Sequence, residues 1–231
     1  MNKYRHIFFD LDHTLWDTDK NSAESLHEIY FELELEAKGI APLGEFLTCY
    51  RSHNEKLWGL WSENKIGPDA LRINRFLHTL RDFDIDDVEL AEEMSRMFIA
   101  RTPYKKHILP GAAKILDYLK EKYTLSIITN GFRDSQIIKL RESGMHNYFE
   151  RIIISEEVGF NKPDPAIFHH AMRAEKLSCK QCIMIGDSFE ADVAGAFAAG
   201  IDQVHLNPHK TPVAFKPTHT IERLDELMRI L

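Results

Sequence analysis

Cysteine is scarce in this sequence, with three residues among 231. Three cysteines cannot form the disulfide framework that holds many small secreted domains together, so we expect a protein of the reducing cytoplasm. Long apolar runs are missing as well, because no stretch approaches the roughly 20 residues of a membrane-spanning helix. The apolar segment near the amino terminus meets Asp10 too early for a secretory signal. The sequence therefore predicts no attachment to a membrane.

Positive charge is in deficit, since 29 lysines and arginines stand against 36 aspartates and glutamates, for a net charge of -7. A phosphate backbone repels a chain of net negative charge, so we expect no binding of nucleic acid polymers. A small anion held by a few local positive groups is not excluded. Internal repeats are missing too, and with 44% hydrophobic and 28% charged residues the composition is that of a globular protein.

Residues 18–103 contain no segment with the pattern of a strand. Apolar residues recur there at spacings of three and four, which is the spacing of one face of a helix. The clearest series are Ala23, Leu26 and Ile29, then Ile73, Phe76 and Leu80, and finally Leu90, Met94 and Phe98. We expect an all-helical domain over residues 18–103, and we assign residues 1–17 and 104–231 to a second domain that it interrupts.

The rest of the chain alternates between short apolar runs and longer amphipathic segments. The runs are residues 7–9, 125–128, 152–154 and 183–185, and the amphipathic segments are residues 112–122, 133–143, 165–175 and 190–199. Continuous apolar strands that alternate with helices indicate a parallel sheet covered on both faces. The predicted fold class is α/β: a Rossmann-like, doubly wound parallel sheet, interrupted after its first strand by the all-helical insert.

Polar residues of catalytic type directly follow three of these strands. Asp10 follows the first strand, Thr129 the second and Asp187 the last. Ligands of open parallel sheets bind at the carboxyl ends of the strands, so these three side chains should converge there. Each one alone could simply cap the next helix, but the three together favour a functional site.

Asp10 and Asp12 place two carboxylates two residues apart where the first strand ends. In an extended chain both side chains face the same way, and like charges that close raise the pKa of one of them. Such a pair suits a division into a nucleophile and a general acid–base. The apolar neighbours Phe9, Leu11 and Trp16 argue against a solvated acidic turn.

Four segments, in order along the chain, resemble the motifs of the haloacid dehalogenase-like (HAD) hydrolase superfamily. They are Asp10-x-Asp12-x-Thr14, Ile127-Ile128-Thr129-Asn130-Gly131, Asn161-Lys162-Pro163-Asp164-Pro165 and Gly186-Asp187-Ser188-Phe189-Glu190-Ala191-Asp192. The resemblance implies an enzyme of subfamily I, whose helical C1 cap is inserted where residues 18–103 lie. His13 departs from the pattern, because many family phosphatases have glycine there. It could touch substrate, but we expect a structural role for it.

The resemblance implies a phosphomonoester hydrolase that works through an aspartyl-phosphate. Asp10 would be the nucleophile, and Asp12 would protonate the leaving group and then deprotonate water. The implied cofactor is Mg²⁺, with the Asp10 carboxylate, the Asp12 main-chain carbonyl and Asp187 as its protein ligands. Asp12 favours phosphate esters over carbon–halogen bonds, because the dehalogenases that name the superfamily lack this second acid.

The other motif residues would hold the transferring phosphoryl group. Lys162 would supply positive charge, although a lysine in such a loop is more often simply solvated. Thr129, Asn130 and Gly131 would bind phosphate or substrate. Asp192 would orient Lys162 or a metal-bound water.

A closer resemblance links the chain to the pyrimidine 5′-nucleotidase branch, whose members remove phosphate from nucleoside monophosphates. It rests on residues 129–132 and 154–159, and on Asn54, Leu57 and Trp58. We therefore expect a small phosphorylated metabolite, a nucleoside 5′-monophosphate, as substrate. Phe132, Trp58 and Trp61 could offer aromatic faces to the base, or both tryptophans could pack inside the helical insert.

Several alternatives stay open at the level of sequence. Phosphoglycolate, a sugar phosphate or pyrophosphate could be the substrate, and a phosphomutase would use the same residues under a cap that excludes water. A phosphate-sensing or protein-binding module would keep the fold without turnover. Cys179 and Cys182 have the spacing of a redox or zinc motif, but no further paired ligands lie near them in the sequence, so we expect them to pack in the protein interior. Oligomeric state and the choice between Mg²⁺ and Mn²⁺ are not encoded.

Overall fold

The computed structural model describes residues 3–40 and 42–231. The chain divides into two compact units, of which one comprises the chain up to Thr18 together with Lys106–Leu231, and the other comprises Asp19–Lys105. The second unit is therefore an insertion into the first. Each unit has its own apolar core, so each is described by itself.

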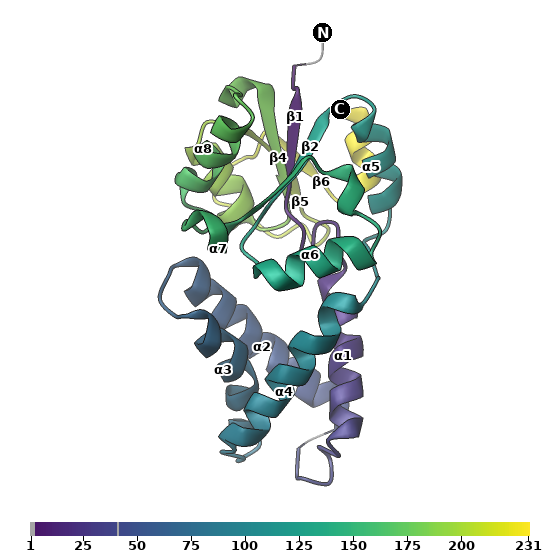
Figure 1. Ribbon diagram of the computed structural model, residues 1–231, viewed down its shortest axis with the longest axis vertical. Helices are drawn as coiled ribbons and strands as arrows, with labels where there is room; N and C mark the ends of the chain where they lie inside the picture. Colours follow the sequence, from purple (N-terminus) through teal and green to yellow (C-terminus); the bar gives the residue numbers. More distant parts are fainter. Residues whose placement is uncertain (1–2, 41) are drawn as a thin grey trace. The chain divides into compact units, whose positions relative to one another are not determined.

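The first unit is built on a six-stranded sheet with the strand order β3-β2-β1-β4-β5-β6 (Figure 1). The strands are β1 (His6–Phe9), β2 (Thr124–Thr129), β3 (Arg151–Ile154), β4 (Cys182–Gly186), β5 (Asp202–Leu206) and β6 (His219–Ile221). Every pairing is parallel, which confirms the predicted α/β fold. The order reverses direction at β1, and such a switch point opens a crevice at the carboxyl ends of the strands.

Helices cover both faces of this sheet (Figure 1). They are α5 (Ala112–Lys120), α6 (Arg133–Glu142), α7 (Ser155–Val158), α8 (Pro165–Ala174) and α9 (Gly195–Ala198), with 3₁₀ turns at His146–Tyr148, Cys179–Gln181 and Leu224–Arg229 and a π-helical segment at Phe189–Ala194. Alternate strand residues face opposite sides. Ile7 and Phe9 pack with Ile115 of α5, whereas Phe8 between them packs with Phe168 of α8.

Two strands and one helix break were not predicted from the sequence. β5 and β6 escaped notice because β5 begins with Asp202 and carries the polar Gln203 and His205, so it has no continuous apolar run. The helix expected over residues 190–199 is a π-helical segment followed by the short α9. At their junction a Cβ on Gly195 would lie 2.9 Å from the backbone of Pro163, so glycine allows the Lys162 loop to come close.

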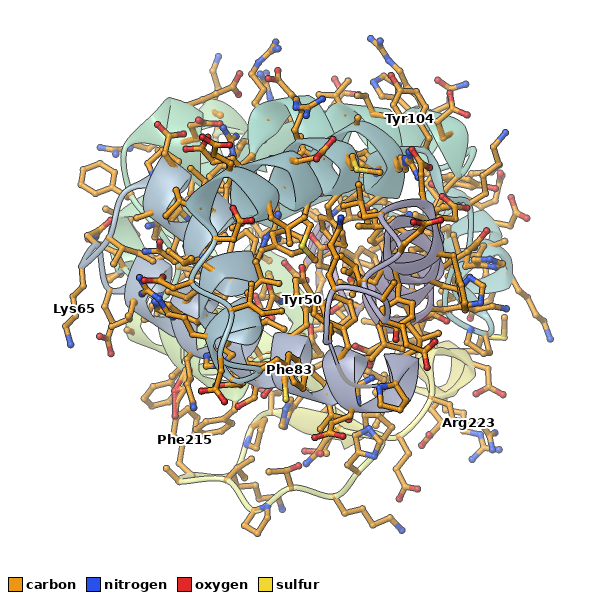
Figure 2. The ribbon with its side chains drawn as sticks, turned by 90° about the horizontal axis from the view of Figure 1, so that it is seen from below. Tyr50, Lys65, Phe83, Tyr104, Phe215 and Arg223 are labelled. Carbon is orange, nitrogen blue, oxygen red and sulfur yellow. The ribbon has the colours of Figure 1, made fainter. Side chains whose placement is uncertain are left out.

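In the second unit, the described residues 19–40 and 42–105 form helices joined by turns and contain no strand, as the sequence predicted. It contains α1 (Thr18–Glu32), α2 (Leu43–Ser62), α3 (Pro68–Arg81), α4 (Val88–Arg101) and the 3₁₀ turn Thr102–Tyr104. Tyr50, Phe76 and Phe98 join α2, α3 and α4, with ring centroids 5.1 to 5.7 Å apart. Tyr50 lies among the helices, whereas Lys65 points away from them (Figure 2). In the described part of the chain, no helix is both long enough and apolar enough to span a membrane.

Candidate active site

The candidate site lies at the carboxyl end of the sheet, beside the point where the strand order reverses. Asp10 immediately follows β1, and its N–H donates to the carbonyl of Ile185 at 2.9 Å, which extends the pairing of β1 with β4 by one residue. Asp187 immediately follows β4. One carboxylate oxygen from each of Asp10, Asp187 and Asp192 lies within 4.8 Å of the other two. The fold thus brings together acids that are far apart in the sequence.

Lys162 neutralises two of these carboxylates from within the protein. Its Nζ donates to Asp10 Oδ1 at 2.6 Å, to Asp192 Oδ1 at 2.6 Å and to the carbonyl of Ile128 at 2.8 Å. Only 2% of Lys162 is exposed. All three ammonium hydrogens therefore have acceptors, so the charge is fixed in place, as electrostatic catalysis requires.

Burial and crowded negative charge shift the proton affinities of this cluster. Burial raises the pKa of Asp10 to about 7, and the charge of Asp192 adds to this rise while Lys162 opposes it. Burial, together with the charge of Asp10, raises the pKa of Asp187 to about 6. Burial alone would lower the pKa of Lys162, but the charges of Asp10 and Asp192 outweigh it and raise that pKa above its ordinary value. Three carboxylates around one ammonium are short of positive charge, and such a donor set fits a hard divalent cation.

Asp192 reaches Lys162 because a glycine ends β4. A Cβ on Gly186 would lie 2.2 Å from Asp192 Oδ2 and 2.6 Å from the Asp192 Cβ. The N–H of Ser188 donates to Asp192 Oδ2 at 3.1 Å, and Asp192 is 1% exposed. The contact with Lys162 corresponds to one of the two roles expected for Asp192 from the sequence.

The turn after β1 fixes Asp187. The hydroxyl of Thr14 donates to Asp187 Oδ1 at 2.9 Å, and the N–H of Asp187 donates back to the same hydroxyl oxygen at 3.1 Å. His13 has a φ of 60°, in the left-handed region, which explains why glycine would also suit this position. Its N–H donates to Thr18 Oγ1 at 3.0 Å.

The turn after β2 connects the phosphate-binding candidates to the Lys162 loop. The N–H of Gly131 donates to Thr129 Oγ1 at 3.0 Å. The side chain of Asn130 donates to the carbonyl of Lys162 at 2.8 Å and accepts from the N–H of Lys162 at 2.8 Å. The Asn130 amide thus holds the main chain from which the Lys162 side chain starts, a contact that the sequence did not predict.

Asp12 has surroundings quite unlike those of Asp10. Gln136 Nε2 donates to Asp12 Oδ2 at 2.7 Å, and Lys139 Nζ donates to Asp12 Oδ1 at 2.6 Å. Burial would raise the pKa of Asp12, but the charge and hydrogen bond of Lys139 and the hydrogen bond of Gln136 outweigh burial and lower that pKa. Sequence reasoning missed Gln136 and Lys139; the available signal was their spacing of three on the helix that follows Thr129, which puts both on one face.

Comparison with known proteins agrees with this geometry. Residues 4–200 match the family model described as haloacid dehalogenase-like hydrolase. The chain belongs to this HAD hydrolase family. Its relatives include the HAD-hydrolase YfnB of Bacillus subtilis, 31% identical over 100% of this chain and 97% of its own. Another is the pyrimidine 5′-nucleotidase YjjG of Escherichia coli, 31% identical over 99% of this chain and 98% of its own. A crystal structure of YfnB, described as bound to magnesium, has a TM-score of 0.89 at 27% identity and covers 99% of each chain.

The three aromatic residues expected to face substrate lie in different units of this HAD hydrolase. Phe132 directly precedes α6 and is 7% exposed. Trp58 and Trp61 lie on α2 of the helical unit, and both are half-buried. Their part in substrate binding stays a prediction.

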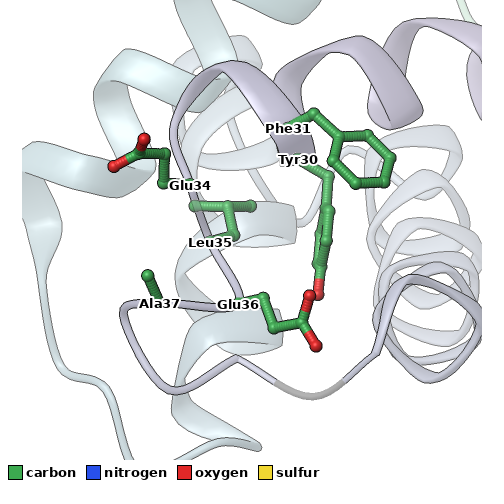
Figure 3. A pocket seen from close by; sticks show the side chains of 6 residues that line it. All are labelled: Tyr30, Phe31, Glu34, Leu35, Glu36 and Ala37. Atoms are coloured by element: carbon green, nitrogen blue, oxygen red, sulfur yellow. The ribbon is translucent and has the colours of Figure 1, made fainter.

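The helical unit of this HAD hydrolase also holds a hollow of about 490 Å³ (Figure 3). It is lined by Tyr30, Phe31, Glu34, Leu35, Glu36 and Ala37. The charged groups in this lining are two carboxylates, so the hollow does not suit a phosphate ester. In the sheet unit, Cys182 is the first residue of β4, and burial raises the pKa of its thiol to about 12, which fits the expected packing role.

Proposed function

We propose that this HAD hydrolase cleaves phosphate monoesters by transferring the phosphoryl group to Asp10, with Mg²⁺ as cofactor. The observation that carries the proposal is the buried ammonium of Lys162, held 2.6 Å from Asp10 Oδ1. A carboxylate nucleophile repels a phosphate dianion, so fixed positive charge beside the nucleophile is what this reaction needs. A module that only sensed phosphate would not require a carboxylate at that position.

Mg²⁺ fits the three carboxylates that lie within 4.8 Å of one another. Asp10 and Asp187 would hold it together with the main-chain carbonyl of Asp12, while Asp192 keeps its contact with Lys162. Bound there, Mg²⁺ would offset the negative charge of both the carboxylates and the phosphate. The magnesium described for the YfnB structure supports the same cofactor for this chain.

The reaction divides into two displacements at phosphorus. A carboxylate oxygen of Asp10 attacks the phosphorus, the bond from phosphorus to the ester oxygen breaks, and Asp12 donates a proton to that departing oxygen. Asp12 would carry this proton because the negative charge of a bound phosphate ester raises its pKa from the lowered value of the substrate-free protein. Water then attacks the phosphorus of phospho-Asp10 while Asp12 takes a proton from it, which releases phosphate and restores the Asp10 carboxylate. Lys162 offsets charge on the phosphoryl oxygens, and the hydroxyl of Thr129 donates to one of them.

The proposed substrate is a nucleoside 5′-monophosphate with a pyrimidine base. YjjG and the pyrimidine 5′-nucleotidase PynA of Streptococcus pneumoniae, each 31% identical over 99% of this chain, support this class. Phe132, Trp58 and Trp61 would contact the base, and Asn130 and Gly131 would line the phosphate. The free state of all three cysteines fits the proposed location in the cytoplasm.

Phosphate release from a panel of esters tests this proposal. The panel contains pyrimidine and purine monophosphates, phosphoglycolate, hexose phosphates and pyrophosphate, each with Mg²⁺ and with a chelator. We expect Mg²⁺-dependent release, fastest from a pyrimidine nucleotide. Asp10→Asn should abolish release, whereas Asp134→Asn, an exposed aspartate of α6, should not. Another preferred ester would overturn the substrate alone; release by folded Asp10→Asn would overturn the mechanism.

A further inference from the structure

The proposed acid–base, Asp12, is held by a helix that none of the four motifs includes. Gln136 and Lys139 lie one turn apart on α6 and donate to different oxygens of its carboxylate, at 2.7 and 2.6 Å. The hydroxyl of Thr18 donates to Asp12 Oδ1 at 3.0 Å. Three donors therefore fix the direction of both carboxylate oxygens.

The two α6 side chains are themselves confined. Gln136 is 1% exposed and occupies the space that a Cβ on Gly131 would fill, since that Cβ would lie 1.5 Å from Gln136 Nε2. Lys139 Nζ lies 4.3 Å from the ring centroid of Trp16, which is fully buried. The amide and the ammonium consequently have little freedom to leave Asp12.

Gln136 makes its contact with Asp12 under an unfavourable condition. Its other amide atom, Oε1, is buried and has no hydrogen-bond partner in the described structure. A buried carbonyl oxygen without a partner destabilises a fold. Stability alone therefore does not account for a glutamine at position 136, whereas its contact with Asp12 does.

We propose that Gln136 and Lys139 are positioning residues that keep the Asp12 carboxylate in line for proton transfer. This inference rests on the proposed function, because it assigns the two residues to the acid–base of that reaction. They act through Asp12 and do not touch the reacting atoms. Proton transfer depends on the donor lying within hydrogen-bond reach of the ester oxygen, so a small displacement of Asp12 slows it strongly.

Leaving-group dependence separates positioning from a merely structural role. A p-nitrophenolate departs without a proton, whereas the alkoxide of a nucleoside monophosphate needs one. In Lys139→Met we expect kcat/KM for the nucleoside monophosphate to fall about 10- to 100-fold, with p-nitrophenyl phosphate changed by less than about threefold. Lys139→Arg should recover most of the loss. Arg141→Met, an exposed cation on the same helix, is the matched control and should match wild type on both esters.

Gln136→Leu tests the second residue in a form that should fold. It removes the unpartnered Oε1 together with the contact to Asp12. The gain from the first offsets the loss from the second, so the variant should remain folded while kcat/KM for the nucleoside monophosphate falls. In an Asp12→Asn background, neither Lys139→Met nor Gln136→Leu should cause any further loss.

Equal losses on both esters, or losses that add to that of Asp12→Asn, would overturn the inference. The inference would also be overturned if Lys139→Met and Gln136→Leu released phosphate as fast as the control Arg141→Met. If wild type is active in the same assay, that result would leave the proposed function intact. If wild-type protein releases phosphate from neither ester, the proposed function itself fails. Melting curves of every variant confirm that slow variants are folded.

Discussion

Asp10 and Asp12 are two residues apart, yet their carboxylates lie in opposite electrostatic surroundings. Asp10 shares a single buried ammonium with Asp192, and burial raises its pKa to about 7. Asp12 has the ammonium of Lys139 and the amide of Gln136, which outweigh burial and lower its pKa. The contrast teaches that a motif supplies two identical acids, and that partners from other elements give them different proton affinities. With Mg²⁺ bound at Asp10 and a phosphate ester beside Asp12, this order would reverse, so that Asp10 is ionised and Asp12 protonated for the proposed roles.

The largest expected effect comes from removing the cation on the Asp10 side. Lys162→Met leaves Asp10 and Asp192 buried with no ammonium between them. We expect turnover to fall about 10³-fold and the free energy of unfolding to drop by about 3–5 kcal/mol at neutral pH. Phosphate release and urea titration measure the two losses. Lys114→Met, which removes an exposed lysine of α5, serves as the control, and a Lys162→Met protein as stable as this control would contradict the account.

Substitution of Gly186 should disturb the surroundings of Asp10 alone, and substitution of Gly131 those of Asp12 alone. Gly186→Ala places a Cβ 2.6 Å from the Cβ of Asp192, so that side chain must move away from Lys162. We expect a loss of about 1–3 kcal/mol in stability and a clear loss of turnover. Gly131→Ala meets the side-chain atoms of Gln136, which must give up its contact with Asp12 but can turn without moving its Cβ, so this variant should unfold less easily than Gly186→Ala. Denaturation midpoints of both variants test this order, and the reverse order would show that the glycines do not act through these side chains.

Metal binding on the Asp10 side should depend on pH in a definite direction. In metal-free protein the pKa values of Asp10 and Asp187, about 7 and about 6, lie above the ordinary 3.8. Between pH 3.8 and these raised values, the folded state therefore binds more protons than the unfolded chain. Their contribution to stability is therefore present at low pH and is lost as the pH rises. Mg²⁺ must displace those protons, so its increase of the melting temperature should be larger at about pH 8 than at about pH 5.5. An equal or larger increase at the lower pH would contradict the assigned site.

The smallest effect is expected at the opposite end of β1, where a buried histidine should make stability depend on pH in the opposite direction. Burial lowers the pKa of His6 to about 4, and its Nε2 lies 2.9 Å from Ser126 Oγ. The unfolded chain therefore binds a proton that the folded chain does not, and stability is lost as the pH falls from about 6.5 towards 4. Wild type should lose up to about 2 kcal/mol more than His6→Gln between about pH 7 and 5. His170→Gln, which replaces an exposed histidine, should behave as wild type in these urea titrations. If the free energy of unfolding of His6→Gln changes with pH as steeply as that of wild type, the prediction is refuted.

The fold and the acids at the strand ends were predictable because they depend on local patterns. Asp10 and Asp187 directly follow apolar strands, and parallel strands bring their ends together whatever the side chains of the helices. β5 could not be predicted in the same way, because Gln203 and His205 break its apolar run.

The contacts that distinguish the two acids were not predictable. Asp12 and Lys139 are 127 positions apart, and their pairing depends on how α6 packs beside the turn after β1. A lysine and a glutamine on a helix are most often solvated, so neither residue stands out in the sequence. Gly131 and Gly186 likewise show their purpose only when Gln136 and Asp192 are seen to fill the space beside them.

The division of labour between Asp10 and Asp12 is tested most directly by trapping the phosphorylated protein. Asp12→Asn should still accept a phosphoryl group from p-nitrophenyl phosphate, whose leaving group needs no proton, but should hydrolyse it slowly. Peptide mass spectrometry after an acid quench should then find one phosphoryl group on the peptide that contains Asp10, and none in Asp10→Asn. A phosphoryl group on another residue, or none in Asp12→Asn beside an active wild type, would contradict the account.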